Sequence, residues 1–111
     1  MSNRQTIYDD LCRIERNLGL NYAVFNNTKV SRDPLKSDFV ISVEEFLKNT
    51  VLIGCKKEKF NVVKTLLDFI EKSEDLNWRI ISLKFLDEDE DLTIVATVKE
   101  KTRSETIISK L

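Results

Sequence analysis

The pattern of apolar and polar residues is most regular from about residue 58 to residue 72. Apolar residues recur there at steps of three and four positions, which is the spacing of one face of an α-helix. The pattern predicts a helix that begins near Glu58 and has a broad apolar face, made of Phe60, Val62, Val63, Leu66, Leu67, Phe69 and Ile70. A face this broad needs a large surface beneath it, and apolar runs at 51–53 and 78–86 flank the helix. We therefore expect the helix to lie on a β-sheet.

A second amphipathic helix is predicted over residues 3–18. Ser2 or Asn3 is suited to cap its start, and Gly19 stands where a residue in the left-handed conformation ends many helices. One face of this helix is apolar and consists of Ile7, Leu11, Ile14 and Leu18.

The region after this helix is predicted to contain short strands. Tyr22–Phe25 is an apolar run, and the polar cluster Asn26–Thr28 behind it suits a turn. Lys29–Ser31 is predicted as a short strand within a surface connection that ends at Asp38. We expect this connection to be the most mobile part of the molecule.

A short helix is predicted next, because Ser42 and Glu45 have the spacing of a capping box. The helix would run for about two turns over Val43–Asn49 and turn Phe46 and Leu47 inward. A strand over residues 38–43 that leads into this helix fits the same sequence.

Three further strands follow from the remaining apolar runs. Thr50–Lys56 is short and apolar enough to be a strand buried on both faces. Residues 78–86 and 92–98 alternate between apolar and polar positions and predict a hairpin. A four-residue loop over Glu88–Asp91 would place Phe85 opposite Ile94, Leu83 opposite Ala96 and Ile81 opposite Val98, so that both apolar sets face one way.

Together these elements predict a single α+β domain that spans residues 1–111. The expected architecture is a two-layer sandwich with helices on one face of a mainly antiparallel sheet, and a ferredoxin-like wiring is one option. The segment from Thr102 onward keeps Ile107, Ile108 and Leu111 apolar. It is compatible with a last short helix, an added strand or a free segment that binds a partner.

Charge and residue usage narrow the function classes. The chain has 18 basic and 19 acidic residues, a balance that argues against a nonspecific nucleic-acid coat protein. It contains no His, so the usual general base and the commonest zinc ligand are missing. Neither a nucleophile elbow nor a phosphate-binding glycine loop occurs. We expect no enzymatic activity, no cofactor and no metal site.

The cysteines and the apolar runs bear on the compartment. Cys12 and Cys55 are not linked by any motif, and Cys12 falls on the apolar side of the first helix. The polar first residues lack the apolar region of a signal peptide, and no apolar run approaches the ~20 residues of a membrane span. We therefore expect a reducing cytoplasm, in a cell or in an infected host. Frequent Lys, Asn and Ile would suit an AT-rich genome, including that of a phage or other virus.

The acidic run over residues 87–91 is the first candidate site. Its alternate residues Asp87, Asp89 and Asp91 resemble the start of a calcium-binding EF-hand loop, but the sixth position is Leu92 instead of Gly and the twelfth is Val98 instead of Glu. The run is therefore interpreted as a solvated hairpin tip. Its negative charge could steer a basic partner.

A lysine cluster is the second candidate site. Lys56, Lys57 and Lys59 join a predicted strand to a predicted helix, where free backbone N–H groups favour anions. They form the best phosphate or nucleic-acid candidate in the chain, with Arg32 and Lys36 as further cations. The alternative interpretation is a solvated connection. The same lysines could give the neighbouring Cys55 some thiolate character, although an inert, half-buried thiol is the favoured interpretation.

Aromatic residues are a third feature, because stacked aromatics on an exposed sheet can bind bases. Most of them lie within apolar runs and are interpreted as core, and Trp78 is the one most readily expected to be partly exposed.

These observations lead to one functional hypothesis and one alternative. The hypothesis is a small non-enzymatic protein-interaction module, such as a regulator, inhibitor or assembly adaptor, that binds a protein partner or itself. The alternative is a nucleic-acid-binding protein that uses Lys56, Lys57 and Lys59. The contact surfaces expected for the interaction module include an exposed sheet edge able to take another strand, together with Asp87, Asp89, Asp91, Ile107, Ile108 and Leu111.

Overall fold

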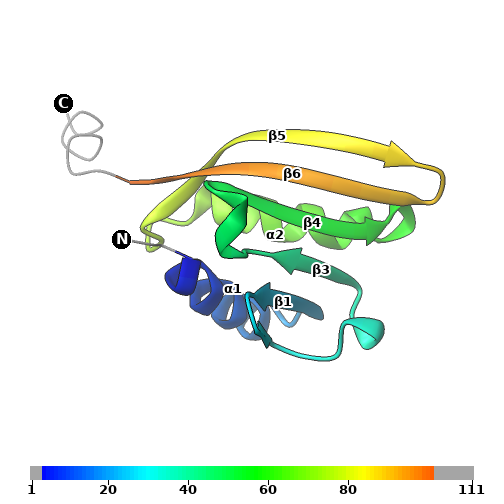
Figure 1. Cartoon of the computed structure of the whole chain (residues 1–111), viewed down its shortest axis with the longest axis horizontal. Helices are drawn as coiled ribbons and strands as arrows, with labels where there is room; N and C mark the ends of the chain where they lie inside the picture. The colour runs from blue at the N-terminus through cyan, green and yellow to red at the C-terminus, as the bar shows by residue number, and fades with distance from the viewer. Residues whose placement is uncertain (1–3, 102–111) are drawn as a thin grey trace.

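The computed structural model describes residues 4–101, and this part of the chain folds into two α-helices and a six-stranded sheet (Figure 1). Three short 3-10 turns connect the elements, at Pro34–Lys36, Glu45–Leu47 and Lys57–Lys59. The helices are α1 (Arg4–Leu18) and α2 (Phe60–Lys72), and the strands are β1 (Tyr22–Asn26), β2 (Lys29–Val30), β3 (Phe39–Ser42), β4 (Thr50–Lys56), β5 (Trp78–Glu88) and β6 (Asp91–Glu100).

The strands lie in the order β2-β1-β3-β4-β6-β5, and every neighbouring pair is antiparallel except β1 and β3. Strand β6 lies between β4 and β5, which are joined by α2. This β4-α2-β5 unit with a strand inserted between its two strands is a split βαβ unit, as in ferredoxin-like folds. The N-terminal half departs from that wiring, because α1 precedes a parallel β1-β3 pair. Figure 1 shows β5 at one edge of the sheet and β1 toward the other.

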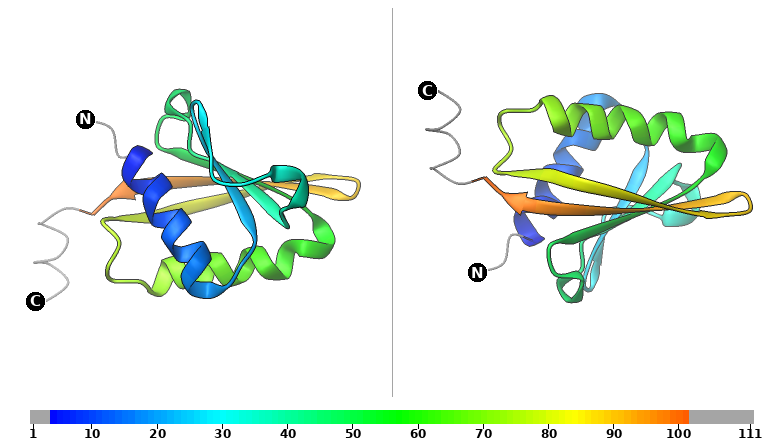
Figure 2. Two further views of the ribbon diagram at one scale, coloured as in Figure 1. Left: turned by 90° about the horizontal axis from the view of Figure 1, so that it is seen from below. Right: turned by 90° about the horizontal axis from the view of Figure 1, so that it is seen from above.

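Both helices cover the same face of the sheet, as the two-layer prediction expects (Figure 2). The register aligns alternate residues of the four central strands, and these residues form one core with the apolar sides of α1 and α2. The predicted N-terminal helix is confirmed, and Gly19 after it has a φ of +69°, the left-handed conformation that suits a residue without a Cβ. The predicted cap at Ser2 or Asn3 lies outside the described residues.

The β5-β6 hairpin has the predicted register over most of its length. Leu83 lies opposite Ala96 and Phe85 opposite Ile94, but the turn contains two residues instead of four, because Glu88 already pairs with Asp91. The ladder shifts by one residue between Ile80 and Ser82. This β-bulge places Ile80 opposite Val98, where the alternation predicted Ile81.

The predicted helix over residues 43–49 is wrong. Only the 3-10 turn Glu45–Leu47 forms, and Phe46 is 73% exposed instead of facing inward, whereas Leu47 is half-buried. Lys48 and Asn49 have φ values of +23° and +57°, which a right-handed helix cannot accommodate. The segment therefore ends after a single turn.

Two predictions about burial are also wrong. Strand β4 is not fully buried on both faces, because Val51, Ile53 and Cys55 are buried while the intervening residues are half-buried. Trp78 is only 3% exposed, and its indole Nε1 donates a hydrogen bond to Asp10 Oδ2 at 2.8 Å. That bond joins β5 to α1 and explains how a polar-tipped ring is accommodated in the core.

Candidate functional site

Strand β5 carries the largest group of exposed apolar side chains. Seven large apolar residues are exposed within residues 5–101, and four of them lie on this strand. Strand β5 has β6 on one side and forms the edge of the sheet on the other. The four side chains and their exposed fractions are Ile81 (50%), Leu83 (40%), Phe85 (48%) and Leu86 (41%).

The exposure of β5 follows from its position at the edge of the sheet. Six strands about 4.8 Å apart make a sheet at least about 24 Å wide, which two helices of roughly 10 Å diameter do not cover completely. The buried residues of α2, Val63, Leu66 and Ile70, share the core with β4 and β6. Strand β5 is therefore left at the margin of the helical layer.

A groove of about 630 Å³ lies between α2 and β5. At one end Phe60 and Phe85 meet edge to face, with ring centroids 5.9 Å apart. The floor is apolar and the charged side chains come from both elements, a composition typical of a surface that binds another molecule. The lining residues are Phe60, Lys64, Leu67, Asp68, Glu71, Arg79, Ile80, Ile81, Ser82, Leu83 and Phe85.

The acidic turn and the lysine cluster, which the sequence presents as separate candidates, lie side by side. Strand β4 pairs with β6 so that Lys56 lies opposite Asp91, and their side chains are 2.9 Å apart. Lys57 forms an ion pair with Asp87, and its backbone N–H donates to the carbonyl of Glu90 at 2.9 Å. The two patches therefore largely neutralise each other where they meet.

The third lysine of the cluster also has an acidic neighbour. Lys59 Nζ lies 3.5 Å from Asp38 Oδ1 on the connection that precedes β3. The Asp91 carboxylate accepts a hydrogen bond from the Lys56 ammonium and raises the pKa of Lys56 above its usual value. Each of the three lysines thus has a carboxylate close by, which weakens the field available to a nucleic-acid phosphate. Asp89 lies in the two-residue turn with a φ of +53°.

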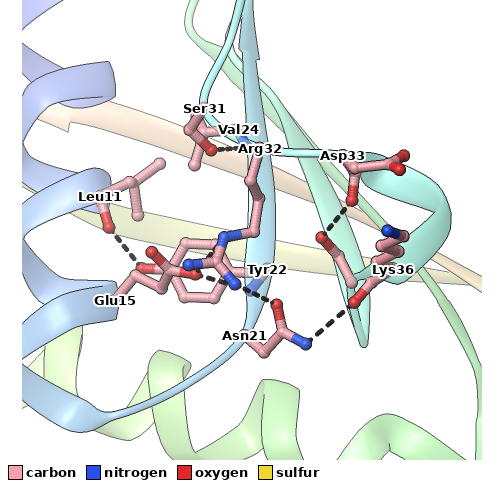
Figure 3. Close-up of polar contacts among 10 residues, drawn as sticks. Leu11, Glu15, Asn21, Tyr22, Val24, Ser31, Arg32, Asp33 and Lys36 are labelled. Atoms are coloured by element: carbon pink, nitrogen blue, oxygen red, sulfur yellow. Dashed lines mark hydrogen bonds and ion pairs between the residues drawn. The ribbon is translucent and has the colours of Figure 1, made fainter.

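The further cations named with the lysine cluster have structural contacts (Figure 3). Arg32 Nε lies 3.0 Å from the Oε2 atom of Glu15, and its Nη1 donates to Asn21 Oδ1 at 2.6 Å. Asn21 Nδ2 in turn donates to the carbonyl of Lys36 at 3.0 Å. The connection that the sequence suggests is mobile is therefore fastened to α1 and to the start of β1.

The same cluster continues into the core. The Tyr22 hydroxyl donates to the carbonyl of Leu11 at 2.6 Å, and its backbone N–H donates to Glu15 Oε2 at 3.2 Å (Figure 3). Burial, with a smaller contribution from Glu15, raises the pKa of Tyr22 above its usual value. Glu15 is only 7% exposed, so its carboxylate depends on these donors. The geometry identifies this cluster as a structural tether.

Neither cysteine has the surroundings of a reactive thiolate. Burial raises the pKa of the Cys55 thiol, and the nearby Asp91 carboxylate raises it further. Burial is also the main cause that raises the pKa of the Cys12 thiol. The lysines beside Cys55 in sequence therefore do not activate it, in agreement with the inert thiol favoured from the sequence.

The apolar surface of β5 was the part of the site that sequence reasoning missed. The alternation places Ile81, Leu83 and Phe85 on one face with the apolar residues of the partner strand, and it does not identify these side chains as a contact surface. The sheet edge that is expected to bind is not specified by the sequence. The doublets Ile80-Ile81 and Phe85-Leu86 break the strict alternation of a half-buried strand and were an available signal. The other apolar candidates, Ile107, Ile108 and Leu111, lie outside the described residues.

Comparison of the chain with protein-family models, with curated proteins and with solved structures finds no match. Neither helix in residues 4–101 is long and apolar enough to cross a membrane.

Proposed function

We propose that this chain is a small non-enzymatic module that binds a protein partner along the free edge of β5. The observation that carries the proposal is the coincidence of three features: an edge of β5 that pairs with no other strand of residues 4–101, four exposed apolar side chains, and an adjoining apolar groove. An extended polypeptide added to such an edge gains backbone hydrogen bonds, and its side chains can enter the groove. This combination suits a protein partner better than a small solute.

The charges around the site support a protein partner over a nucleic acid. Lys56, Lys57 and Lys59 each lie beside a carboxylate, whereas nucleic-acid affinity comes mainly from cations that replace counterions on phosphates. The groove itself carries both signs of charge, from Lys64 and Arg79 and from Asp68 and Glu71. A mixed rim around an apolar floor is typical of protein interfaces.

Selection of binding peptides from a displayed library of random dodecamers tests the proposal. We expect the folded chain to enrich extended peptides with alternate apolar residues, and we expect Leu83→Lys to lower their affinity at least tenfold. Leu35→Lys is the matched control, because Leu35 is 93% exposed on the Pro34–Lys36 turn and does not line the groove.

Two results would count against the proposed function. One is enriched peptides that bind the Leu83→Lys and Leu35→Lys variants equally well. The other is binding of mixed-sequence DNA or RNA that falls steeply with salt and disappears when Lys56, Lys57 and Lys59 are changed to Gln. The second result would establish the nucleic-acid alternative.

A further inference from the structure

We propose that the partner at the β5 edge is a second copy of this chain, and that two β5 strands pair antiparallel about a two-fold axis at Leu83. The pairing would join two six-stranded sheets into one continuous sheet of twelve strands. The inference rests on the proposed function, since it uses the same edge and groove. It adds the identity of the partner, the direction of the strands and their register.

The backbone of β5 permits this register. In an antiparallel pair, residues alternate between positions that exchange hydrogen bonds with the neighbouring strand and positions that do not. Glu88 and Asp91 flank a two-residue turn and are a hydrogen-bonded pair. If they were a non-hydrogen-bonded pair, the next hydrogen-bonded pair would be the two turn residues, which are adjacent in the chain and cannot bond to each other in this way. Counting back along the regular ladder, Leu83, Phe85 and Asp87 direct their backbone N–H and C=O groups to the free edge. A two-fold axis at Leu83 therefore makes a hydrogen-bonded pair of the two Leu83 residues.

The side chains favour Leu83 over the neighbouring centres. Pairing about Leu83 places Phe85 of each copy beside the Ile80-Ile81 bulge of the other, so apolar side chains meet along the seam. Pairing about Phe85 would instead set Leu83 against Asp87. Leu83 and Phe85 lie opposite buried residues of β6, so they project toward the helical layer and the groove. The two grooves would then merge beneath the two copies of α2.

The distribution of charge favours the antiparallel direction. Arg79 lies near the start of β5 and Glu88 lies at its end. Their partners in β6 stand at the positions that alternate with the buried residues of that strand. Glu88 therefore projects from the sheet face that lacks helices, and Arg79 lies at the edge itself, where it also lines the groove. Antiparallel pairing brings Arg79 of each copy near Glu88 of the other, whereas parallel pairing would align like charges. In the antiparallel register, Lys84 of one copy would face Ser82 of the other copy instead of a second lysine.

Strand β5 carries two features that usually discourage edge pairing, a bulge and a central lysine. The bulge lies between Ile80 and Ser82, outside the regular ladder from Ser82 to Glu88. Lys84 lies within that ladder, and in the proposed register it would face Ser82 of the other copy. The seam is short compared with a standard protein interface, and we expect a dimer that dissociates in the micromolar range.

Light scattering coupled to size exclusion across a concentration series tests the inference on the full chain. We expect a concentration-dependent dimer for the wild type and for Leu35→Lys, and a monomer for Leu83→Lys at every concentration. Retained fluorescence of the buried Trp78 would show that Leu83→Lys folds. A dimer that survives Leu83→Lys, or a wild type that is monomeric throughout, would overturn the inference.

Cysteine cross-linking tests the register independently. Residues in a hydrogen-bonded antiparallel pair have Cα atoms about 5.5 Å apart, within the range that a disulfide spans. We expect Leu83→Cys to form a covalent dimer under mild oxidation and Ser82→Cys, which would face Lys84, to remain largely monomeric. Equal cross-linking of the two variants would contradict the register.

The failure of this inference and of the proposed function can be told apart. A monomeric wild type whose displayed peptides still require Leu83 would leave the β5 edge as a binding site and remove only the second copy. A monomer in which the Leu83 amide is protected from hydrogen exchange would assign the edge to another segment of the same chain. Loss of both self-association and peptide binding would remove the function as well.

Discussion

The ion pair between Arg32 and Glu15 offers a test of how carboxylate burial sets the strength of a charge pair. The Arg32 side chain is 46% exposed and the Glu15 side chain only 8% exposed. The chain contains a matched pair of different burial, in which Lys57 is 45% exposed and Asp87 is 72% exposed. The two cations are equally accessible, so a difference in effect reports on the carboxylates.

The perturbation is replacement of each cation by Met, which removes the charge and keeps an apolar stem. Breaking a fully buried ion pair costs about 3–5 kcal/mol, and we expect about 2 kcal/mol for Arg32→Met because water reaches the half-exposed guanidinium site. Among the described residues, the backbone N–H of Tyr22 would remain as the donor to the Glu15 carboxylate. Lys57→Met should cost under about 0.5 kcal/mol, since an exposed carboxylate is resolvated at once.

Urea unfolding followed by the fluorescence of Trp78, the single tryptophan, measures both changes. For an m-value of about 1.5 kcal/mol/M, a loss of about 2 kcal/mol lowers the urea midpoint by roughly 1.3 M. Glu15→Gln should cost less than Arg32→Met, because the amide oxygen still accepts from Tyr22 and the charge left without its partner is the half-exposed guanidinium instead of the buried carboxylate. Equal destabilisation by Arg32→Met and Lys57→Met would refute the reasoning.

Two further predictions concern groups whose pKa is raised by burial. Tyr22→Phe should cost about 1 kcal/mol at neutral pH through loss of the bond to Leu11. The wild type should lose stability at up to ~1.4 kcal/mol per pH unit above the unfolded tyrosine pKa of about 10, because only the unfolded chain releases that proton. Urea unfolding at two alkaline pH values checks this, and an equal loss in Tyr22→Phe would contradict it. Cys55 should react with iodoacetamide many times more slowly in the folded chain than in urea at pH 8, as measured by peptide mass spectrometry; rapid labelling of the folded chain would rule out the buried thiol.

Local patterns in the sequence were enough to predict much of the fold. The periodicity of α1 and α2 and the alternation of β5 and β6 give the helices and the hairpin register, because these depend on residues close in the chain. The segment over residues 43–49 shows the limit of such patterns. Its capping-box spacing is genuine, but the positive φ values of Lys48 and Asn49 end the helix after one turn, and that backbone conformation has no reliable signal in residue type.

The candidate site was harder to predict because it depends on contacts between distant segments. The lysine cluster and the acidic turn are about thirty residues apart in sequence, and only the pairing of β4 with β6 brings Lys56 to Asp91. The exposure of Leu83 and Phe85 likewise depends on how far two helices extend over six strands. Alternation shows which side of a strand faces the helices, but it does not show whether a helix covers that position.

The interior position of β6 has a consequence for how the chain reaches its folded state. A nascent chain that stops before Asp91 contains β4 and β5 but lacks the strand that separates them, so the two would stand about 10 Å apart with no shared hydrogen bonds. Closure of the two-residue turn after Glu88 then delivers β6 by a local movement with little loss of loop entropy. The sheet is thus completed from within, after β5 has been made, and the pairing of β6 with both β4 and β5 joins its two halves.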